Sequence, residues 1–141
     1  MNDDGSRLDA ARRFLADHHR AVLVTRRGSG ELQSSPVAAT CDAAGRILVS
    51  TRTGSAKERN VTRDPRVTLC VLSDEWYGPW VHVDGRAEVV RLPEAMDVLV
   101  DYYKRVAGEH PDWDDYRRAM NQERRVALRI SLVRAGPLQG G

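Results

Sequence analysis

Residues 48–71 read LVSTRTGSAKERNVTRDPRVTLCV and predict a strand, a short helix and a second strand in close succession. Ser55 is followed three residues later by Glu58, which is the spacing of a capping box at a helix start. Asp64 and Pro65 end that helix, because a residue that precedes proline is disfavoured in the α-helical conformation. Residues 66–73 then alternate again and are expected to form the next strand.

Upstream of this stretch the sequence predicts a helix and a meander of strands. Residues 6–19 place apolar side chains three or four apart, which is typical of an amphipathic helix. Residues 21–26, 31–41 and 46–52 carry strand patterns and are separated by short turn-forming segments. Pro36 has no backbone N–H, so it predicts an edge, a bulge or a bend in the second of these strands.

Downstream, an aromatic loop at 74–80 precedes a strand over 80–90, helices from Pro93 and over about 112–121, and a last strand over 125–134. Short connections between strands favour an antiparallel sheet, and six such strands protect their edges best by closing into a barrel. We therefore expect a mainly β fold with flanking helices, formed by one domain over residues 1–134. Residues 1–5 and 135–141 are expected to be flexible tails.

The composition excludes several classes of protein. A chain of 141 residues with 22 basic and 20 acidic side chains carries a formal charge of +2, too little for a surface that wraps nucleic acid. No Cys or His spacing of a zinc site, no dinucleotide-binding glycine motif and no phosphate-binding loop are present. The acidic start MNDDGS and the short apolar runs predict a cytoplasmic protein without a signal peptide or a membrane-spanning segment.

Positive charge is concentrated in one segment. Between positions 52 and 66 five basic residues stand against two acidic ones, a local charge of +3. Hydroxyl side chains and the start of a short helix lie beside these charges, and together they indicate an anion site suited to a phosphate. A solvated basic helix explains the same charges, and the charge pattern alone does not separate the two interpretations. The basic residues are Arg52, Lys57, Arg59, Arg63 and Arg66.

The same segment carries a family resemblance. A strand that ends in S-T-R is followed by G-x-A-K-x-R-N and then by R-D-P-R-V. This pattern resembles the flavin- and deazaflavin-binding split-barrel family related to pyridoxamine phosphate oxidases, most of all its actinobacterial branch that uses coenzyme F420. Residues 31–50 and 78–90 are similar to neighbouring family segments, so the likeness covers about residues 14–134.

The resemblance implies a six-stranded split β-barrel that forms a homodimer, with a cofactor groove at each side of the interface. Trp76, Tyr77 and Trp80 would cover the site, either from the same subunit or from the partner subunit. Ser55 stands where the family often has a second basic residue, which lowers the expected affinity for anions. The remaining implied cofactor-binding residues are Ser34, Ser35, Pro36 and Val37 along the ring, and Ser50, Thr51, Arg52, Ala56, Lys57 and Asn60 around the phosphate and ring.

Three functions compete at this point. The first is a reductase that passes a hydride from reduced coenzyme F420 to a conjugated or heterocyclic small molecule, for example a biliverdin-like tetrapyrrole. The second is an FMN-dependent enzyme of the pyridoxamine phosphate oxidase type, and the third is a flavin-binding module without catalysis. No catalytic acid or base is assigned. His82 has an exposed strand position that suits either a proton donor or a side chain without a role.

Overall fold

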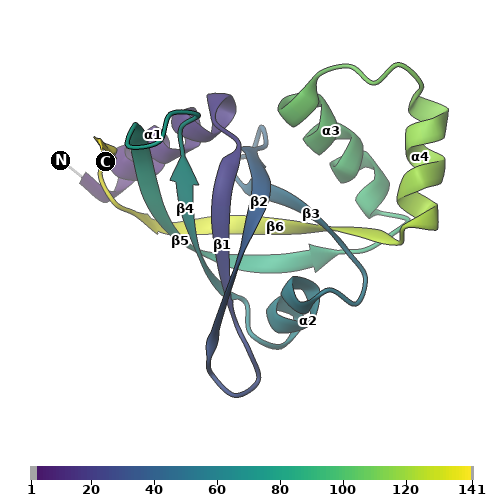
Figure 1. The fold of residues 1–141 in the computed structure, drawn as a ribbon, viewed down its shortest axis with the longest axis horizontal. Coiled ribbons are helices and arrows are strands. Elements are labelled where there is room, and N and C mark those ends of the chain that lie inside the picture. The colour runs from purple at the N-terminus through teal and green to yellow at the C-terminus, as the bar shows by residue number, and fades with distance from the viewer. Residues whose placement is uncertain (1–2, 141) are drawn as a thin grey trace.

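In the computed structural model, which describes residues 3–140, the expected strands form a closed antiparallel barrel (Figure 1). The strands pair in the order β4-β1-β2-β3-β6-β5, and pairing of β4 with β5 closes the barrel. The expected antiparallel split barrel with flanking helices is confirmed. The elements are α1 (Asp3–Asp17), β1 (Arg20–Arg26), β2 (Leu32–Cys41), β3 (Ile47–Arg52), α2 (Ala56–Arg63), β4 (Arg66–Leu72), β5 (Pro79–Val90), α3 (Ala95–Ala107), α4 (Trp113–Gln122), β6 (Arg125–Ala135) and β7 (Gln139–Gly140).

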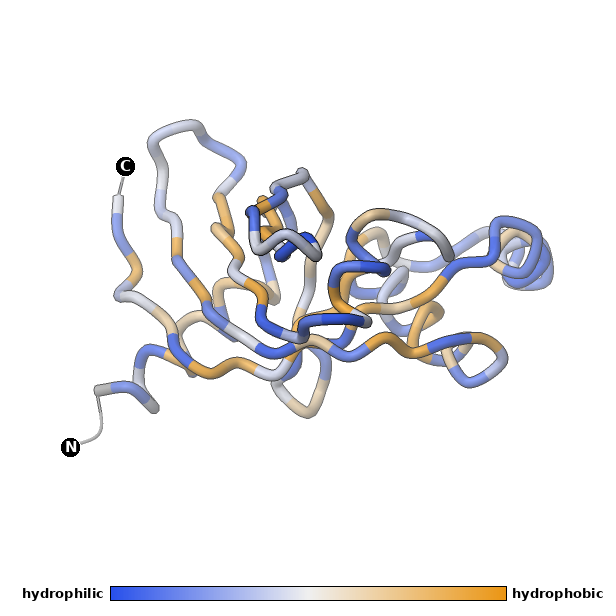
Figure 2. Tube along the Cα trace, turned by 90° about the horizontal axis from the view of Figure 1, so that it is seen from below, coloured by the Kyte–Doolittle hydropathy of each residue, from blue (hydrophilic) through white to orange (hydrophobic). Residues whose placement is uncertain are grey.

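Alternating side chains fill the barrel. Leu23, Leu69, Val83 and Ile130 come from four different strands and are almost fully buried in one core cluster. The intervening residues of these strands face outward, as expected for a pleated strand with one buried face. In Figure 2 hydrophobic stretches lie along the strands, whereas the end of the molecule formed by α4 is mostly hydrophilic.

Two helical regions extend this core. Phe14 and Leu15 of α1 pack on the barrel. Leu99 of α3 and Tyr116 of α4 form a second cluster against β6, where the Tyr116 hydroxyl donates a hydrogen bond of 2.8 Å to the Leu99 carbonyl oxygen. Burial raises the pKa of Tyr116 to about 12. Across residues 3–140, no helix has both the length and the apolar character needed to cross a bilayer.

The expected tails differ from the structure in part. Helix α1 begins at Asp3, inside the segment 1–5, and acidic residues such as Asp4 suit the positive end of a helix dipole. At the other end β6 continues to Ala135, and β7 pairs with the start of β5 through Pro79 and Trp80. Of the two expected tails, residues 1, 2 and 141 lie outside the described residues.

Strands β2 and β3 separate partway along their length, and we call this place the β2–β3 fork. Their pairing extends only from Cys41↔Ile47 to Ala39↔Val49. Beyond it, residues 32–38 of β2 pair with β1 alone, and residues 50–52 of β3 pair with β6 alone. One edge of β2 is therefore open along residues 32–38, and Pro36 lies in this open part, which confirms the edge position expected from its missing N–H.

Tyr102 of α3 occupies the point where the strands part. Its hydroxyl donates a hydrogen bond of 2.9 Å to the carbonyl oxygen of Ala38 on β2. It also accepts a hydrogen bond from the backbone of Ser50 on β3. Burial raises the pKa of Tyr102, and the Ser50 contact offsets this only in part. The hydroxyl thus bridges two backbones that no longer pair with each other.

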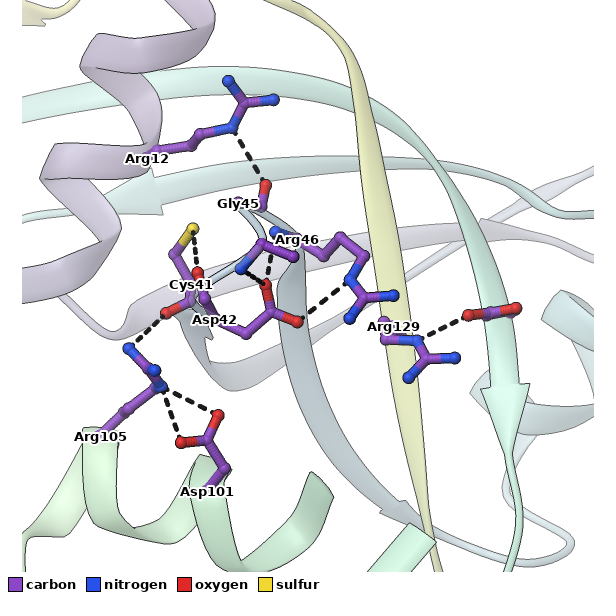
Figure 3. A network of polar contacts seen from close by, with 10 residues as sticks. Arg12, Cys41, Asp42, Gly45, Arg46, Asp101, Arg105 and Arg129 are labelled. Carbon is purple, nitrogen blue, oxygen red and sulfur yellow. Dashed lines mark hydrogen bonds and ion pairs between the residues drawn. The ribbon is translucent and has the colours of Figure 1, made fainter. Parts of the chain in front are cut away.

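Asp42 shapes the turn that joins β2 to β3 (Figure 3). Its Oδ1 accepts hydrogen bonds of 2.9 Å from the backbone N–H groups of Ala44 and Arg46. Its Oδ2 accepts a hydrogen bond of 3.1 Å from the Arg46 guanidinium. A carboxylate that accepts from backbone two residues ahead closes an Asx turn, which explains why aspartate begins this connection.

Two helices are fastened to the same turn (Figure 3). Arg12 of α1 donates a hydrogen bond of 3.0 Å to the carbonyl oxygen of Gly45. Arg105 of α3 donates one of 3.2 Å to the carbonyl oxygen of Cys41, and its guanidinium is paired with Asp101. The turn therefore holds α1 and α3 in place at the paired end of the fork.

Replacing Asp42 with alanine is expected to lower the free energy of unfolding by about 1–2 kcal/mol, because the backbone N–H groups of the turn lose a charged acceptor. Chemical denaturation followed by circular dichroism measures this change. Asp114→Ala on the exposed side of α4 is the control and should change it little. Equal stability of Asp42→Ala and the unsubstituted protein would contradict the assigned role.

Candidate functional site

The start of α2 is fixed to the end of β3 by two hydroxyl groups. The Ser55 Oγ accepts a hydrogen bond of 3.1 Å from the backbone N–H of Glu58 and caps the helix. The Thr51 hydroxyl donates one of 3.0 Å to the same Ser55 Oγ. The N-cap predicted from the spacing is confirmed, and the buried Thr51 side chain holds the Ser55 hydroxyl in position.

The Glu58 carboxylate does not complete the capping box. It is buried and accepts a hydrogen bond of 2.7 Å from the Arg91 guanidinium. Arg91 also donates to the Thr62 hydroxyl one turn further along α2. This ion pair ties the helix to the segment that follows β5, and the sequence held no signal for it because the partners are far apart in the chain.

Lys57 lies in the first turn of α2 and is half-buried. Within residues 3–140 its ammonium group has neither a hydrogen bond nor an ion pair. A cation at the N-terminal end of a helix is unfavourable, because the helix dipole places partial positive charge there. Lys57 and the helix end therefore add their positive potentials at one point, and an anion at that point would be bound by both.

The arginines of the basic segment are engaged with their own chain. Arg52 pairs with Glu123 at 3.3 Å, and hydrogen bonds from Arg125 and then from Arg52 lower the pKa of Glu123. Arg66 pairs with Asp64 at 2.8 Å. Arg59 donates to the Gly54 carbonyl oxygen, and Arg63 donates to Asn60 and to the Arg26 carbonyl oxygen. Arg59 and Arg63 thus contact uncharged oxygen atoms, and Lys57 is the basic residue of the segment that has no polar contact among residues 3–140.

Asn60 is buried and its amide is satisfied within the chain. Its Nδ2 donates hydrogen bonds of 3.0 Å to the Thr25 hydroxyl and 3.2 Å to Gln33 Oε1. Its Oδ1 accepts one of 3.0 Å from Arg63. Asn60 therefore anchors α2 to β1 and β2, and its predicted contact with a cofactor stays a prediction.

The residues predicted along the cofactor ring lie on the open part of β2. Ser34 and Pro36 are exposed, whereas Ser35 and Val37 are half-buried and Val37 packs against the barrel core. Across the fork stands Ser50 on β3, which is half-buried. Asn60 of α2 contacts Gln33 of β2, and Ser55 before α2 contacts Thr51 of β3, so α2 is tied to both strands on the unpaired side of the fork. The structure thus groups the predicted residues of β2, β3 and α2.

The predicted aromatic cover lies elsewhere in the same chain. Trp76 and Tyr77 are each 77% exposed in the connection between β4 and β5, and Tyr77 has a positive φ of 66°. Trp80 begins β5, and the strands β4 and β1 separate it from the open edge of β2. At about 4.8 Å between neighbouring strands this separation is about 14 Å. Within one chain these aromatic residues do not cover the fork.

Tyr102 is the site residue that sequence reasoning missed. Like Tyr103, Trp113 and Tyr116, it stands at helical spacing, which indicates only a core or interface position. No local pattern distinguishes a tyrosine that packs from one whose hydroxyl enters a gap between strands. The hydrogen bonds to Ala38 and Ser50 are contacts over long chain separations, so only the fold reveals them.

The pyridoxamine 5'-phosphate oxidase family pattern matches residues 8–136. A conserved hypothetical protein from Mycobacterium tuberculosis is similar in structure, with a TM-score of 0.75, 24% identity, and coverage of 94% of this chain and 83% of that one. A structure described as an F420 reductase is similar with a TM-score of 0.66 and 20% identity, and the match covers 88% of this chain and 94% of that one. General stress protein 26 from Bacillus anthracis is similar with a TM-score of 0.63 and 12% identity, and the match covers 95% of this chain and 98% of that one. The chain therefore belongs to the pyridoxamine 5'-phosphate oxidase family.

Proposed function

We propose that this protein is a coenzyme F420-dependent reductase. The observation that carries the proposal is the unpaired, half-buried Lys57 at the start of α2, the helix that Asn60 ties to Gln33 on the open part of β2. Coenzyme F420 carries a phosphate and an oligoglutamate tail, so it is strongly anionic and suits a cation that has no counterion. The A-K-x-R-N context of Lys57, and the similarity in fold to a structure described as an F420 reductase, favour the deazaflavin.

The residues of the fork suit two different parts of the cofactor, its phosphate and its ring system. Lys57 and the N-terminal turn of α2 would hold the phosphate, since both present positive potential. The open edge of β2 at Ser34 and Pro36, with Ser50 opposite, would lie along the ring system. When bound, reduced F420 supplies the hydride. The protein itself then has to position ring and acceptor and keep water away from them.

FMN is the second candidate cofactor, because the family match is to pyridoxamine 5'-phosphate oxidases. Its phosphate would use the same Lys57 and the same helix end. The two cofactors differ in the anionic tail, which FMN lacks. Comparing the affinities of the cofactor-free protein for F420 and for FMN therefore distinguishes the first two functions. A test for turnover distinguishes both from the third, which is binding without catalysis.

The test is a titration of the cofactor-free protein with each cofactor, followed by ligand fluorescence. We expect F420 to bind with a dissociation constant of about 1 μM or lower, equivalent to about 8 kcal/mol, and FMN to bind more weakly. Tight binding of FMN together with no binding of F420 would overturn the proposal. Oxidation of reduced F420 is then followed with quinone, nitro and tetrapyrrole acceptors, and no oxidation with any of them would favour the non-catalytic module.

We also propose that the protein forms a homodimer through the outer face of β2, β1, β4 and β5. Pro36, Val22, Cys70 and His82 are paired in register across these strands, so they form one row on this face. Pro36 is exposed, and Val22 and Cys70 are half-buried. An exposed apolar face of this kind marks a protein contact, and a partner seated there would bring its own aromatic loop toward the fork.

Val22→Lys is expected to prevent dimer formation, because it places a charge in the centre of this face. Light scattering coupled to size-exclusion chromatography should give twice the chain mass of 15.8 kDa for the unsubstituted protein and the single mass for the variant. Ala16→Lys on the exposed side of α1 is the control and should leave the dimer intact. A dimer that persists in Val22→Lys would place the interface elsewhere.

A further inference from the structure

Four arginines line one pocket on the outside of the barrel, on the face formed by β1, β4 and β5. They are Arg26 of β1, Arg66 of β4, Arg86 of β5 and Arg134 of β6, and we call this site the arginine pocket. Its volume is about 570 Å³. The other lining residues include apolar Val24, Leu32, Val67 and Val133, together with Thr68, Asp84 and Gly85.

Three of these guanidinium groups are not neutralised by a contact. In the described chain, the side chains of Arg26, Arg86 and Arg134 make neither a hydrogen bond nor an ion pair. Arg26 is in addition half-buried, where an unpaired charge is costly. Arg66 pairs with Asp64, whose pKa is held well below its usual range by the Arg66 hydrogen bonds.

Nearby carboxylates do not cancel this charge. Asp84 also lines the pocket, but it accepts a hydrogen bond of 2.8 Å from the Thr68 hydroxyl and lies 3.1 Å from His82 Nε2. The hydrogen bonds from Thr68 and His82 lower the pKa of Asp84 against the opposing effect of burial. Four guanidinium groups against the carboxylates of Asp64 and Asp84 leave a charge of +2 at the pocket.

The strand register brings like charges together. Arg66 on β4 and Arg86 on β5 are directly opposite each other. Like charges in such a cross-strand pair destabilise a sheet. The arginines of the pocket therefore repel one another in the protein without a ligand. An anion bound between them would replace this repulsion with attraction.

An irregularity in the sheet adds the fourth arginine. The register of β5 and β6 shifts at Asp84/Gly85, so that Gly85 pairs with Leu132 while Asp84 pairs with Arg134. Val133 is left between these pairs and is 53% exposed. The bulge turns both Val133 and Arg134 into the lining of the pocket, as bulges commonly re-aim side chains near binding sites.

We propose that the arginine pocket binds an organic acid that carries at least two carboxylates on an apolar body. Arginine forks match carboxylate oxygens in pairs, and a charge of +2 suits a dianion. The valine and leucine side chains of the lining contact the apolar part of the ligand, which a bare inorganic anion would leave unused. Lys57 does not line this pocket, so the proposal does not require F420 to bind at Lys57. The pocket is lined by one chain and adjoins the proposed dimer contact, since Val24, Thr68 and Asp84 stand two residues along from Val22, Cys70 and His82.

Isothermal titration calorimetry of the full-length protein tests the proposal with hexanedioate. Hexanoate has the same carbon chain and one carboxylate, and inorganic phosphate has the charge without the apolar body. We expect hexanedioate to bind at least about tenfold more tightly than either, because each additional charge-assisted contact is worth about tenfold or more. Equal affinity for hexanedioate and hexanoate would overturn the dicarboxylate assignment, and tighter binding of phosphate would overturn the organic acid.

Variants locate the binding site. The double variant Arg86→Gln/Arg134→Gln should weaken hexanedioate binding by about 100-fold, one factor of ten for each arginine. The control Arg117→Gln removes an exposed arginine of α4 and should change the affinity less than twofold. Unchanged binding by the double variant would overturn the proposal, as would loss of binding in Lys57→Ala, which would place the anion at the fork instead.

Discussion

Lys57→Ala is expected to weaken the binding of coenzyme F420 by about 10- to 150-fold. A hydrogen bond to a charged group contributes about 1.5–3 kcal/mol, and each 1.4 kcal/mol is a factor of ten in affinity. The loss of affinity is expected to be near the upper end of this range if the phosphate lies between Lys57 and the start of α2, because both attract it. Fluorescence titration of the cofactor measures the change.

The same substitution should not destabilise the cofactor-free protein. Lys57 has no partner among residues 3–140, and it stands at the unfavourable end of the helix dipole. Alanine at this position is therefore expected to leave the midpoint of denaturation unchanged or slightly higher. A residue retained for stability would behave in the opposite way, so a clear loss of stability in Lys57→Ala would contradict the assigned role.

Lys104 is the matched control for this experiment, because it is the other lysine of the chain. It is exposed on α3, with its ammonium 5.3 Å from the centre of the ring of Trp113, which packs against the second core cluster. Lys104→Ala should bind F420 as the unsubstituted protein does. Equal weakening by both lysine substitutions would indicate a general loss of positive charge instead of a contact made by Lys57.

Asn60→Ala is expected to lower the free energy of unfolding by about 2–4 kcal/mol. The side chain is 5% exposed, and its loss leaves the Thr25 hydroxyl and Gln33 without their amide partner in a buried place. Each buried polar group left without a hydrogen bond costs about 1–3 kcal/mol. Urea denaturation of the cofactor-free protein measures the change.

Asn121→Ala is the control, because Asn121 is exposed on α4. It should change stability by less than about 0.5 kcal/mol. If Asn60→Ala were as stable as this control, the anchoring of α2 to β1 and β2 would be wrong. Reduced stability with an unchanged F420 affinity would separate the structural role of Asn60 from the cofactor contact that the family resemblance implies.

The candidate site was predictable to the extent that it is contiguous in the chain. The capping spacing from Ser55 to Glu58 placed the start of α2, and the concentration of basic residues between 52 and 66 singled out the segment. The sequence also limited Pro36 to an edge, a bulge or a bend, and the fold decided for the edge. It did not show which of the basic residues is unpaired, because partners such as Glu123 and Asp64 become known only when chain segments meet.

Two further features depended on distant contacts. Tyr102 reaches the fork from a helix that follows β5, more than sixty positions after Ala38. The arginine pocket draws one arginine from each of four strands. Its assembly depends on the bulge at Gly85, where a side chain would meet Ile130 and Ser131. Neither has a local pattern, since each member is an ordinary residue in its own strand or helix.

The sequence by itself determined the order of helices and strands, the antiparallel barrel and the segment that carries the positive charge, because hydrophobic period, capping spacing and turn residues act over a few neighbouring positions. Only the tertiary structure decided where the barrel splits, that Lys57 alone among the basic residues of that segment has no polar contact within residues 3–140, that Asn60 is an anchor, and that four arginines converge. These depend on strand register and on ion pairs between remote segments, and such contacts are chosen by the packing of the whole chain.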